Sequence, residues 1–495
     1  MLREQPGQAF QVGKPTTICG SKMTTVTRLS YSLLAGQLSN RATRAVLGLC
    51  GLRSASLRAY LETFLNQQPG VEGSFLADPV FEAIFGWKQA NPTIGDLSGG
   101  LLHPDLVRAL RDAHTQGLSE DYRFPYDRRP YTHQLAAWQT LSETDPVRSV
   151  LVTSGTGSGK TECFLVPILN DLSRELERCQ GHPLMGVRAL FLYPLNALIK
   201  SQQDRLVAWS EPFHGKLRFC LYNGDTPEQG RRVWQSQVPD RRTLRSQPPP
   251  ILVTNATMLE YLLVRGEDRP ILDQSQGGLR WIVIDEAHSY IGSQAAELAL
   301  LLRRVVHAFG VRAEQIHFIA TSATLGDASE KSRQHLTDFL ADVAGVSTER
   351  VRVIEGFREV PPLHAAPEAQ SPHTLAAMRE LSPANLYSAL AGWPSALAMR
   401  QALVERPQRL SDLARLVWEK DGALSRQQTL HLLDLCTDAV NDHGEPFLPL
   451  RGHFFHRTLS GVWACGNRSC SGRMQSVLDN EGWPFGAVFL ERHIK

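Results

Sequence analysis

Residues 154–161 read Ser154-Gly155-Thr156-Gly157-Ser158-Gly159-Lys160-Thr161 and directly follow the apolar run Ser149–Thr153. In such a loop, glycines let successive backbone N–H groups turn inward around phosphates, the lysine reaches the β- and γ-phosphates, and the last hydroxyl binds Mg²⁺. A helix that starts at the loop adds its positive N-terminal dipole. Because a strand and a helix flank the loop, the sequence predicts an ATP phosphate-binding site rather than a chance glycine-rich turn.

Short β-rich runs recur on the C-terminal side of this loop, and amphipathic helical stretches lie between several of them. The runs are 188–193, 217–222, 251–254, 281–284 and 317–320. Strands that alternate with helices predict an α/β fold with a parallel, doubly wound sheet. Ligands bind such sheets beyond the carboxyl ends of the strands, and the polar motifs of this sequence fall at those ends.

A second polar motif follows the apolar run Trp281–Ile284, where the sequence continues Asp285-Glu286-Ala287-His288. A carboxylate at a buried strand end that faces a phosphate loop can hold Mg²⁺, which assigns that role to Asp285 together with Thr161. The adjacent Glu286 is expected to orient the attacking water. Four residues alone could be an ordinary acidic turn, but their pairing with the phosphate loop favours a hydrolase site.

The composition excludes several classes of protein. Hydrophobic residues make up 42% of the 495 residues, which is enough apolar material for large cores and argues against a largely disordered chain. Lys and Arg number 52 against 50 Asp and Glu, so a nucleic-acid site would have to be a local patch. No apolar stretch reaches the roughly 18 residues of a membrane span, and no secretory signal opens the sequence. With eight mostly scattered cysteines, we expect a cytoplasmic protein that contacts no membrane.

The chain is expected to contain four segments. Residues 1–122 carry a helical pattern at 33–65 and are interpreted as an N-terminal helical accessory region. Residues 123–345 hold the ATP-binding domain, and residues 346–455 are predicted as a helical linker or a winged-helix-like region. Residues 456–495 begin a cysteine-containing module.

The motifs and their order resemble those of superfamily 2 helicases of the DEAD/DEAH-box type. The resemblance covers residues 130–324, which would form one complete RecA-like P-loop domain. It implies that Gln134, in Pro130-Tyr131-Thr132-His133-Gln134, contacts adenine, and that His288 belongs to the catalytic set with Lys160, Asp285 and Glu286. The implied cofactors are ATP and Mg²⁺.

Further strand-end segments resemble the family's nucleic-acid-binding and coupling motifs. They are Tyr193-Pro194-Leu195-Asn196-Ala197-Leu198 with Gln202, Asn223-Gly224-Asp225, Thr254-Asn255-Ala256-Thr257-Met258-Leu259 and Ser322-Ala323-Thr324. The resemblance implies nucleic-acid contacts at Pro194, Asn196, Gln202, Gly224, Asp225, Thr254 and Asn255. It implies that Ser322, Ala323 and Thr324 link the nucleotide state to nucleic-acid binding.

Two finer segments are similar to one branch of these helicases, which carries a C-terminal cysteine-containing domain. They are His288-Ser289-Tyr290-Ile291-Gly292 with Glu297, and Leu450-Arg451-Gly452-His453-Phe454-Phe455-His456-Arg457. Members of that branch serve in DNA repair and in phage-defence systems such as DISARM and Druantia. The resemblance therefore implies DNA as the partner, with RNA as the open alternative.

Cys465 and Cys470 could form half of a Zn²⁺ site. Tetrahedral zinc takes four ligands, and the 25 residues that follow Cys470 supply no further cysteine. Two unliganded thiols in a surface turn are the alternative. In the resembling helicases a second cysteine pair follows a short distance later.

One expected motif is absent from the sequence after Thr324. Superfamily 2 motors close the ATP site with arginines of a second RecA-like domain, in a motif resembling Gln-x-x-Gly-Arg-x-Gly-Arg, and no such string follows. We therefore expect a motor completed by a downstream or separate polypeptide. Two alternatives stay open: a module that binds ATP and DNA with negligible turnover, and a truncated helicase fragment.

The segment 226–246 is a candidate basic patch for nucleic acid. It holds five arginines against Glu228 and Asp240, and it contains Trp234, which could stack on a base. A solvated loop with a buried tryptophan is an equally good interpretation.

Overall fold

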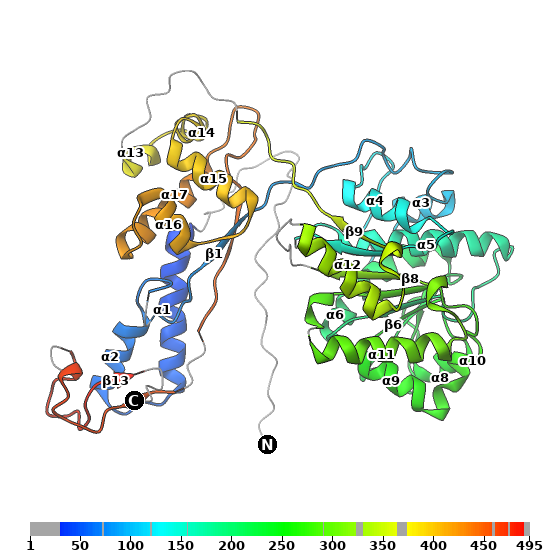
Figure 1. Cartoon of the computed structure of the whole chain (residues 1–495), viewed down its shortest axis with the longest axis horizontal. Coiled ribbons are helices and arrows are strands. Elements are labelled where there is room, and N and C mark those ends of the chain that lie inside the picture. The colour runs from blue at the N-terminus through cyan, green and yellow to red at the C-terminus, as the bar shows by residue number, and fades with distance from the viewer. Residues whose placement is uncertain are drawn as a thin grey trace. The chain divides into compact units, whose positions relative to one another are not determined.

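The computed structural model describes residues 30–71, 74–118, 121–155, 157–290, 292–322, 330–363, 374–457, 461–473 and 476–489 (Figure 1). Three residues with predicted roles, Thr156, Ala323 and Thr324, lie outside these ranges. The chain divides into two compact units, one of Phe85–Val360 and one of Met1–Ile84 with Pro361–Lys495. Each unit is described by itself.

The unit Phe85–Val360 is built on an eight-stranded sheet in which all pairings are parallel, in the order β5-β4-β6-β3-β7-β8-β2-β9. The predicted doubly wound α/β fold is thereby confirmed. The strands are β2 (Ser149–Thr153), β3 (Ala189–Leu192), β4 (Phe219–Leu221), β5 (Gln237–Val238), β6 (Ile251–Thr254), β7 (Trp281–Ile284), β8 (His317–Ser322) and β9 (Val351–Glu355). The last of these lies beyond the segment 123–345 in which we expected the domain.

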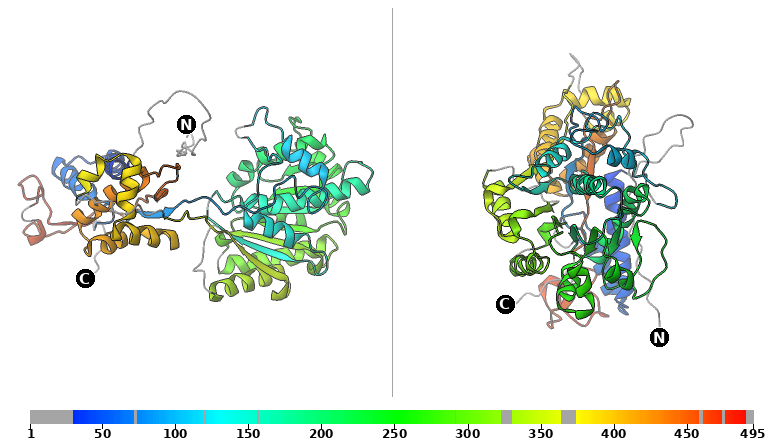
Figure 2. Two further views of the ribbon diagram at one scale, coloured as in Figure 1. Left: turned by 90° about the horizontal axis from the view of Figure 1, so that it is seen from above. Right: turned by 90° about the vertical axis from the view of Figure 1, so that its right-hand side faces the viewer.

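Helices cover both faces of the sheet (Figures 1 and 2). They are α3 (Pro104–Arg111), α4 (Thr132–Leu141), α5 (Lys160–Arg178), α6 (Asn196–Ser201), α7 (Gln203–Ser210), α8 (Arg241–Ser246), α9 (Ala256–Val264), α10 (Arg269–Asp273), α11 (Ser293–Ala308) and α12 (Glu330–Ala344). Successive strand residues point to opposite faces, so Val150 and Val152 pack in the core under α4 and α5, whereas Leu151 packs in the core under α11 and α12. Burial on both faces explains why the strands are apolar throughout rather than alternating.

The register brings the carboxyl ends of the central strands to one edge. Thr153 pairs with Ser322 across β2 and β8, and Leu192 pairs with both Thr254 and Ile284. The residues that follow these strands are the phosphate loop, the segment after Tyr193, Asn255 and the Asp285–His288 motif. The sheet therefore gathers at one edge the motifs that are far apart in the sequence.

The second unit joins the N-terminal and C-terminal parts of the chain. Its three-stranded antiparallel sheet has the order β10-β1-β11, with β1 (Val80–Ala83) in the centre, β10 (Gln408–Arg409) and β11 (Leu450–His453). Its helices are α1 (Tyr31–Leu49), α2 (Ala55–Leu65), α13 (Leu375–Arg379), α14 (Pro383–Ala391), α15 (Pro394–Glu405), α16 (Leu410–Trp418) and α17 (Ala423–Asp438). The helical pattern predicted at 33–65 is confirmed as α1 and α2.

Helices α16 and α17 with this small sheet have the element types of a winged-helix module, but α17 is covered. Asp434 of α17 accepts hydrogen bonds from the backbone of Tyr31 (2.5 Å) and the hydroxyl of Ser32 (2.6 Å), which places the α1 N-terminus on α17. A carboxylate at a helix N-terminus is stabilising because it pairs with unsatisfied N–H groups and the helix dipole. Contact with α1 restricts access of a DNA groove to α17.

The cysteine-containing segment packs on the N-terminal helices. Its two short strands, β12 (Trp463–Ala464) and β13 (Val488–Phe489), pair antiparallel. Leu478, Trp483 and Val488 share an apolar cluster with residues of α1 and α2, namely Leu47, Leu61 and Leu65. In the described ranges of both units, no helix is long and apolar enough to cross a membrane.

Candidate functional site

The phosphate loop connects β2 to α5 as predicted. Gly157 and Gly159 adopt left-handed backbone conformations with φ of 79° and 74°, which glycine reaches without strain, and Gly159 caps α5. The hydroxyls of Ser154 and Ser158 lie 2.5 Å apart, and Lys160 Nζ donates to the carbonyl oxygen of Ser154 at 3.0 Å. The lysine therefore spans the loop from its end back to its beginning.

Two glycines of the loop differ in their surroundings. A Cβ at Gly157 would meet nothing within 4 Å, so no neighbouring atom fills the space beside this glycine. A Cβ at Gly159 would instead clash with Gln134 Nε2, which explains why the loop needs glycine there. Thr161 follows in the first turn of α5 and is half-buried. With the positive helix end behind it, this arrangement fits an ATP phosphate chain.

Asp285 lies at the end of β7, with 8% of its surface exposed, and accepts a hydrogen bond from the hydroxyl of Thr321. Burial raises the pKa of the Asp285 carboxyl and Glu286 adds to the rise, whereas the Thr321 hydroxyl and Lys160 oppose it. Burial also lowers the pKa of the Lys160 ammonium group, and the negative charges of Glu286 and Asp285 act against this decrease. A buried carboxylate of this kind gains from a divalent cation, so the site fits Mg²⁺.

The backbone conformation and a backbone hydrogen bond fix the position of Glu286. Its φ of 52° is left-handed, and its N–H donates to Thr321 Oγ1 at 3.2 Å. Its Oε2 lies 3.2 Å from Nδ1 of His288 and is buried, yet it makes no hydrogen bond within the described part of the chain. The carboxylate therefore lies next to Asp285 in sequence and beside the His288 ring, with no hydrogen bond to its Oε2 among the described residues.

Gln134 connects the adenine-motif segment to the phosphate loop. Its Oε1 accepts from the backbone N–H of Tyr131 at 2.9 Å, and its Nε2 donates to the carbonyl oxygen of Gly159 at 3.2 Å. A polar cavity of about 410 Å³ opens beside it, lined by Gln89, Asp127, Arg128, Arg129, Tyr131 and Gln134. The cavity is a candidate place for the base. Of its lining, Tyr131 and Gln134 belong to the motif recognised in the sequence, and only Gln134 was assigned an adenine contact.

Two further residues that contact the phosphate loop are not part of any sequence motif. Trp87 and Arg358 contact the loop at Gly155, and a Cβ on Gly356 would lie 2.8 Å from Ser154 Cβ. The Arg358 guanidinium stacks 4.2 Å above the Trp87 ring and donates to the carbonyl oxygen of Phe85 at 2.7 Å. No motif marks these residues, because they come from the two ends of the unit and meet only in the fold.

The predicted nucleic-acid contacts are partly assembled. Asn196 begins α6 and accepts a hydrogen bond from the Asn255 side chain at 2.8 Å, which joins two of the strand-end segments. Asn255 also caps α9 by accepting from the N–H of Met258. Gly224 and Asp225 are exposed, whereas Thr254 is fully buried and offers no surface. The residues Pro194 and Gln202 are half-buried on either side of α6, and Ser322 is buried at the end of β8.

The basic segment 226–246 is less free than its composition suggests. Arg245 pairs with Glu228, Glu267 and the buried Asp268, and Arg241 donates to backbone carbonyls at 2.9 and 3.2 Å. Trp234 is half-buried, and its ring lies 5.3 Å from that of His114. The structure favours the interpretation of a packed tryptophan, and among the five arginines it leaves Arg231, Arg232 and Arg242 exposed.

Cys465 and Cys470 lie in one turn. The Cys465 N–H donates to the Ala487 carbonyl at 2.8 Å, and a Cβ on Gly486 would lie 3.0 Å or less from the Cβ atoms of both cysteines. Backbone N–H groups of Ala487 and Gly472, with the neighbouring Cys465, hold the pKa of Cys470 below its ordinary value. In the described ranges no group of three or more His, Cys, Asp or Glu side chains is placed to hold a metal.

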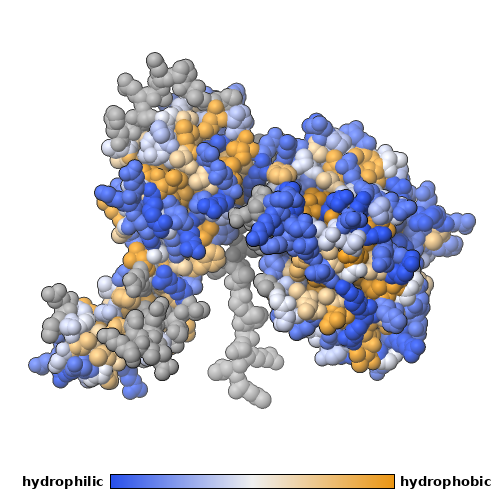
Figure 3. All heavy atoms as spheres, viewed as in Figure 1, coloured by the Kyte–Doolittle hydropathy of each residue, from blue (hydrophilic) through white to orange (hydrophobic). Residues whose placement is uncertain are grey.

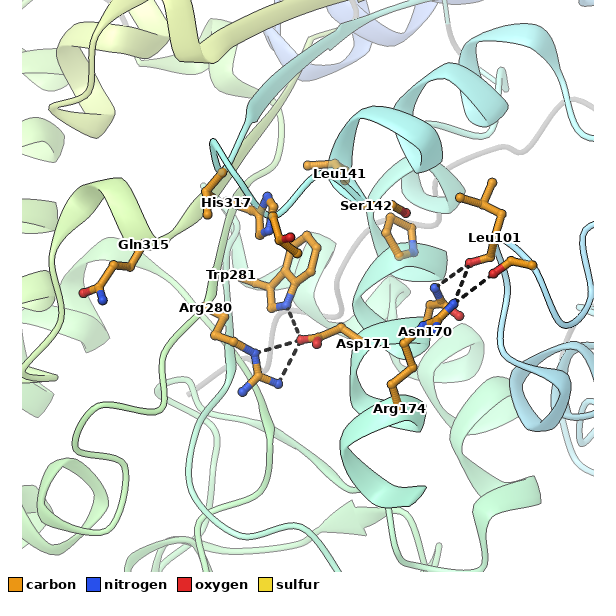
Figure 4. A pocket seen from close by; sticks show the side chains of 14 residues that line it. Leu101, Leu141, Ser142, Asn170, Asp171, Arg174, Arg280, Trp281, Gln315 and His317 are labelled. Atoms are coloured by element: carbon orange, nitrogen blue, oxygen red, sulfur yellow. Dashed lines mark hydrogen bonds and ion pairs between the residues drawn. The ribbon is translucent and has the colours of Figure 1, made fainter. Parts of the chain in front are cut away.

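A second hollow, of about 480 Å³, opens at the amino ends of β7 and β8, opposite the phosphate loop (Figure 4). Arg280 and the Trp281 indole both bind Asp171, at 2.8–2.9 Å. His317 stacks on Trp281 with ring centroids 4.2 Å apart, and its Nδ1 donates to the carbonyl oxygen of Arg148 at 2.8 Å. These contacts join β7, β8 and α5, so we interpret the region as structural.

The burial of His317 predicts a pH-dependent stability. Burial lowers the pKa of His317 in the folded chain. The imidazole is therefore protonated at a lower pH in the folded chain than in the unfolded chain, where its pKa is near 6.5. The free energy of unfolding should therefore be at its maximum above about pH 7. It should decrease as the pH falls below about 6.5, by at most about 1.4 kcal/mol per pH unit for one group. Urea unfolding at several pH values measures this.

His317→Asn is the matched variant, because asparagine keeps a donor near the Nδ1 position and does not titrate. We expect a shallower loss of stability between about pH 6.5 and 5 than in the wild type. Parallel curves for the two proteins would show that His317 is not the responsible group.

Comparisons with known proteins agree with the motifs. The sequence model of the family "DEAD/DEAH box helicase" matches residues 131–332. Druantia protein DruE of Escherichia coli (strain UMEA 4076-1) is 26% identical over 481 residues, which cover 70% of this chain and 26% of DruE. The uncharacterized ATP-dependent helicase YprA of Bacillus subtilis (strain 168) is 27% identical over 204 residues, covering 41% of this chain and 24% of YprA.

Among solved structures, the DUF1998 helicase MrfA bound to DNA and AMPPNP matches with 20% identity and a TM-score of 0.39, over 74% of this chain and 44% of that one. The chain spans about a quarter of the length of these two curated relatives.

Proposed function

We propose, since residues 131–332 form a DEAD/DEAH box helicase domain of superfamily 2, that this chain supplies the first motor domain of a nucleic-acid-dependent ATPase. The observation that carries the proposal is the meeting of Lys160 with the buried Asp285 and with Glu286 at the carboxyl edge of the sheet. These groups are spaced widely in sequence, and their combination is what phosphoryl transfer requires: positioning and charge stabilisation.

Each residue has a chemical task in this proposal. The N–H groups of the loop and Lys160 bind the phosphates and neutralise their charge, and Gln134 fixes the loop against the base-side cavity. Glu286 orients the attacking water through its carboxylate, and His288 beside it limits the positions the carboxylate can take. Thr161 and Asp285 would hold Mg²⁺, which when bound offsets the negative charge of the phosphates.

Glu286→Gln is expected to separate binding from hydrolysis. The amide keeps the shape of the side chain but loses the charge that polarises water, so ATP affinity should stay within about threefold while turnover of the completed enzyme falls by about 10²–10⁴. A filter-binding assay and steady-state hydrolysis of the completed enzyme give the two numbers. Intact hydrolysis in the variant would mean that another residue positions the water.

The nucleic-acid partner is proposed to be DNA, and the setting phage defence or repair. Support comes from the similarity to Druantia protein DruE over most of this chain and from the open strand-end residues Asn196, Gly224 and Asp225. Backbone contacts from such loops set affinity without sequence preference. Competition between single-stranded DNA and RNA of equal length tests the choice, and preferential binding of RNA would reverse it.

A module that binds ATP and DNA but turns over slowly is the second candidate. It concerns residues 1–495 taken by themselves, in which no Gln-x-x-Gly-Arg-x-Gly-Arg motif follows Thr324. A completing RecA-like domain from a downstream or separate polypeptide would convert this module into the motor, so the two proposals differ in whether such a partner stimulates hydrolysis.

We further propose that Cys465 and Cys470 form half of a Zn²⁺ site. The turn that brings them together and the lowered pKa of Cys470 support thiolate character, which zinc requires. The four-segment domain assignment and the cytoplasmic location also remain proposals, the latter supported by free cysteines at all seven described positions.

A further inference from the structure

Three polar side chains lie behind the phosphate loop and have no role in the account above. Glu162 is in the first turn of α5, two residues after Lys160, Tyr193 follows β3, and Arg205 is on α7. Glu162 Oε2, the Tyr193 hydroxyl and Arg205 Nε are buried and have no hydrogen-bond partner among the residues that the structure describes. Because folded proteins leave few buried polar atoms unpaired, three of them in one region call for a functional explanation.

Opposite charges connect two of these side chains. A guanidinium nitrogen of Arg205 lies 3.6 Å from Glu162 Oε1, and the two side chains are 22% and 12% exposed. This distance is longer than a hydrogen bond, so the pair has room to tighten. The Arg205 guanidinium also lies 5.6 Å from the centre of the Tyr122 ring, which limits where it can move.

Glu162 contacts the phosphate loop directly. A Cβ on Gly159 would lie 2.9 Å from Glu162 Oε2, so the carboxylate rests against the last glycine of the loop. The carbonyl oxygen of Glu162 accepts from the Trp138 indole at 2.9 Å, which fixes its backbone. A movement of the Glu162 side chain would therefore change the packing against Gly159, which is next to Lys160.

Arg205 lies next to the segment that is proposed to contact nucleic acid. Gln202 joins α6 to α7, and Arg205 lies three residues later on α7, hence on the same helical face. Asn196 begins α6, and its bond to Asn255 ties this helix to the neighbouring strand-end segment. Nucleic acid bound along α6 and Gln202 would thus act on the helix that carries Arg205.

Tyr193 places the same cluster near the Mg²⁺ carboxylate. Burial raises the pKa of its hydroxyl, the charge of Asp285 adds to the rise, and Arg205 opposes it. The Tyr193 hydroxyl therefore lies where the charges of both Asp285 and Arg205 act on it.

We propose that Arg205 is a positioning residue which, through its ion pair with Glu162, makes nucleotide binding at the phosphate loop depend on nucleic acid bound at α6 and α7. The inference rests on the proposed function, since it needs a site for each ligand. It goes further by naming the contact that couples the two sites. Coupling between two ligands is a free energy and is reciprocal, so nucleotide should tighten nucleic-acid binding by the same factor.

The test is a double-mutant cycle on residues 1–495. The dissociation constant of a fluorescent, non-hydrolysable ATP analogue is measured with and without saturating single-stranded DNA for the wild type, Glu162→Gln, Arg205→Gln and the double variant. We expect DNA to tighten nucleotide binding about fivefold or more in the wild type, and by less than about twofold in either single variant. The double variant should be no worse than the single ones, because both remove one interaction.

Two further variants separate coupling from a structural role. Arg205→Lys keeps the charge and should keep most of the coupling. Arg188→Gln is the matched control, because Arg188 pairs at 3.0 Å with Glu175 of the same helix α5, at similar burial, on the opposite edge of the sheet. We expect it to leave the coupling unchanged. Thermal midpoints for all variants check that each one is folded.

The outcomes are distinguishable. Wild-type coupling that persists in folded Arg205→Gln overturns the inference, as does an equal loss in Arg188→Gln. Weaker DNA binding by Arg205→Gln in the absence of nucleotide would assign Arg205 to direct nucleic-acid contact and also overturn it. A wild type that binds both ligands without coupling overturns the inference and leaves the proposed function standing, whereas a wild type that binds no nucleotide overturns both.

Discussion

Purified residues 1–495 are expected to hydrolyse ATP about 10³–10⁵ times more slowly than a helicase whose ATP site is closed by arginines of a second motor domain. The fold supplies the loop, Lys160, Asp285 and Glu286, so nucleotide can bind. Negative charge that builds on the γ-phosphate in the transition state is then offset only by groups of this domain, and not by arginines of a second motor domain. Such a loss corresponds to about 4–7 kcal/mol of barrier.

Steady-state hydrolysis with and without single-stranded DNA measures this expectation. The completed enzyme, or this chain mixed with the polypeptide that carries the arginine motif, is the positive control. DNA-stimulated turnover near about 1 s⁻¹ by residues 1–495 alone, within the ordinary range of enzymes, would contradict the expectation. It would mean that a residue of this chain, or a second copy of it, supplies the missing charge.

Lys160→Ala is expected to abolish measurable binding of a fluorescent ATP analogue, a loss of at least about 100-fold, or about 3 kcal/mol. The substitution removes the cation that spans the phosphate loop through its bond to the Ser154 carbonyl. It also leaves Asp285 and Glu286 facing the phosphates without the charge that now opposes them.

Lys216→Ala is the matched control, because Lys216 is an exposed lysine of the same unit outside the motifs. Its affinity for the analogue should equal that of the wild type. Unchanged affinity in folded Lys160→Ala would rule out the assignment of the phosphate loop.

The central strands could be predicted because each one is short, apolar on both faces and followed by a polar motif. Strand β9 was missed, since Val351–Glu355 carries exposed Arg352 and does not stand out as a buried strand. The pairing of α1 with α17 could not be predicted either. It depends on a bond between Tyr31 and Asp434, 403 positions apart, and no local pattern signals such a contact.

The same distinction applies to the site. Lys160, Asp285 and Glu286 are recognisable because their chemistry needs a fixed local spacing. Thr321, which binds both Asp285 and Glu286, has no such spacing and is known only from the fold. Composition misled at the basic segment, where Arg245 is held by three acidic side chains and is not free to meet a phosphate.

The hydropathy of the surface does not by itself mark a functional site. On the face shown in Figure 3, hydrophilic and apolar side chains are interspersed. Exposed apolar residues do occur, for example Val264 on α9 and Leu300 on α11, which are 74% and 68% exposed. Single exposed apolar side chains are normal on protein surfaces, so function is better argued from the strand-end motifs.

Calorimetric titration of ATP into wild-type residues 1–495 with Mg²⁺ tests the central claim most directly. The account predicts saturable binding with one ATP per chain, displacement by ADP, and weaker binding when EDTA removes the cation that Asp285 and Thr161 would hold. Absence of binding by the folded chain, or binding that Lys160→Ala retains unchanged, would contradict the assignment of this edge of the sheet as an ATP site.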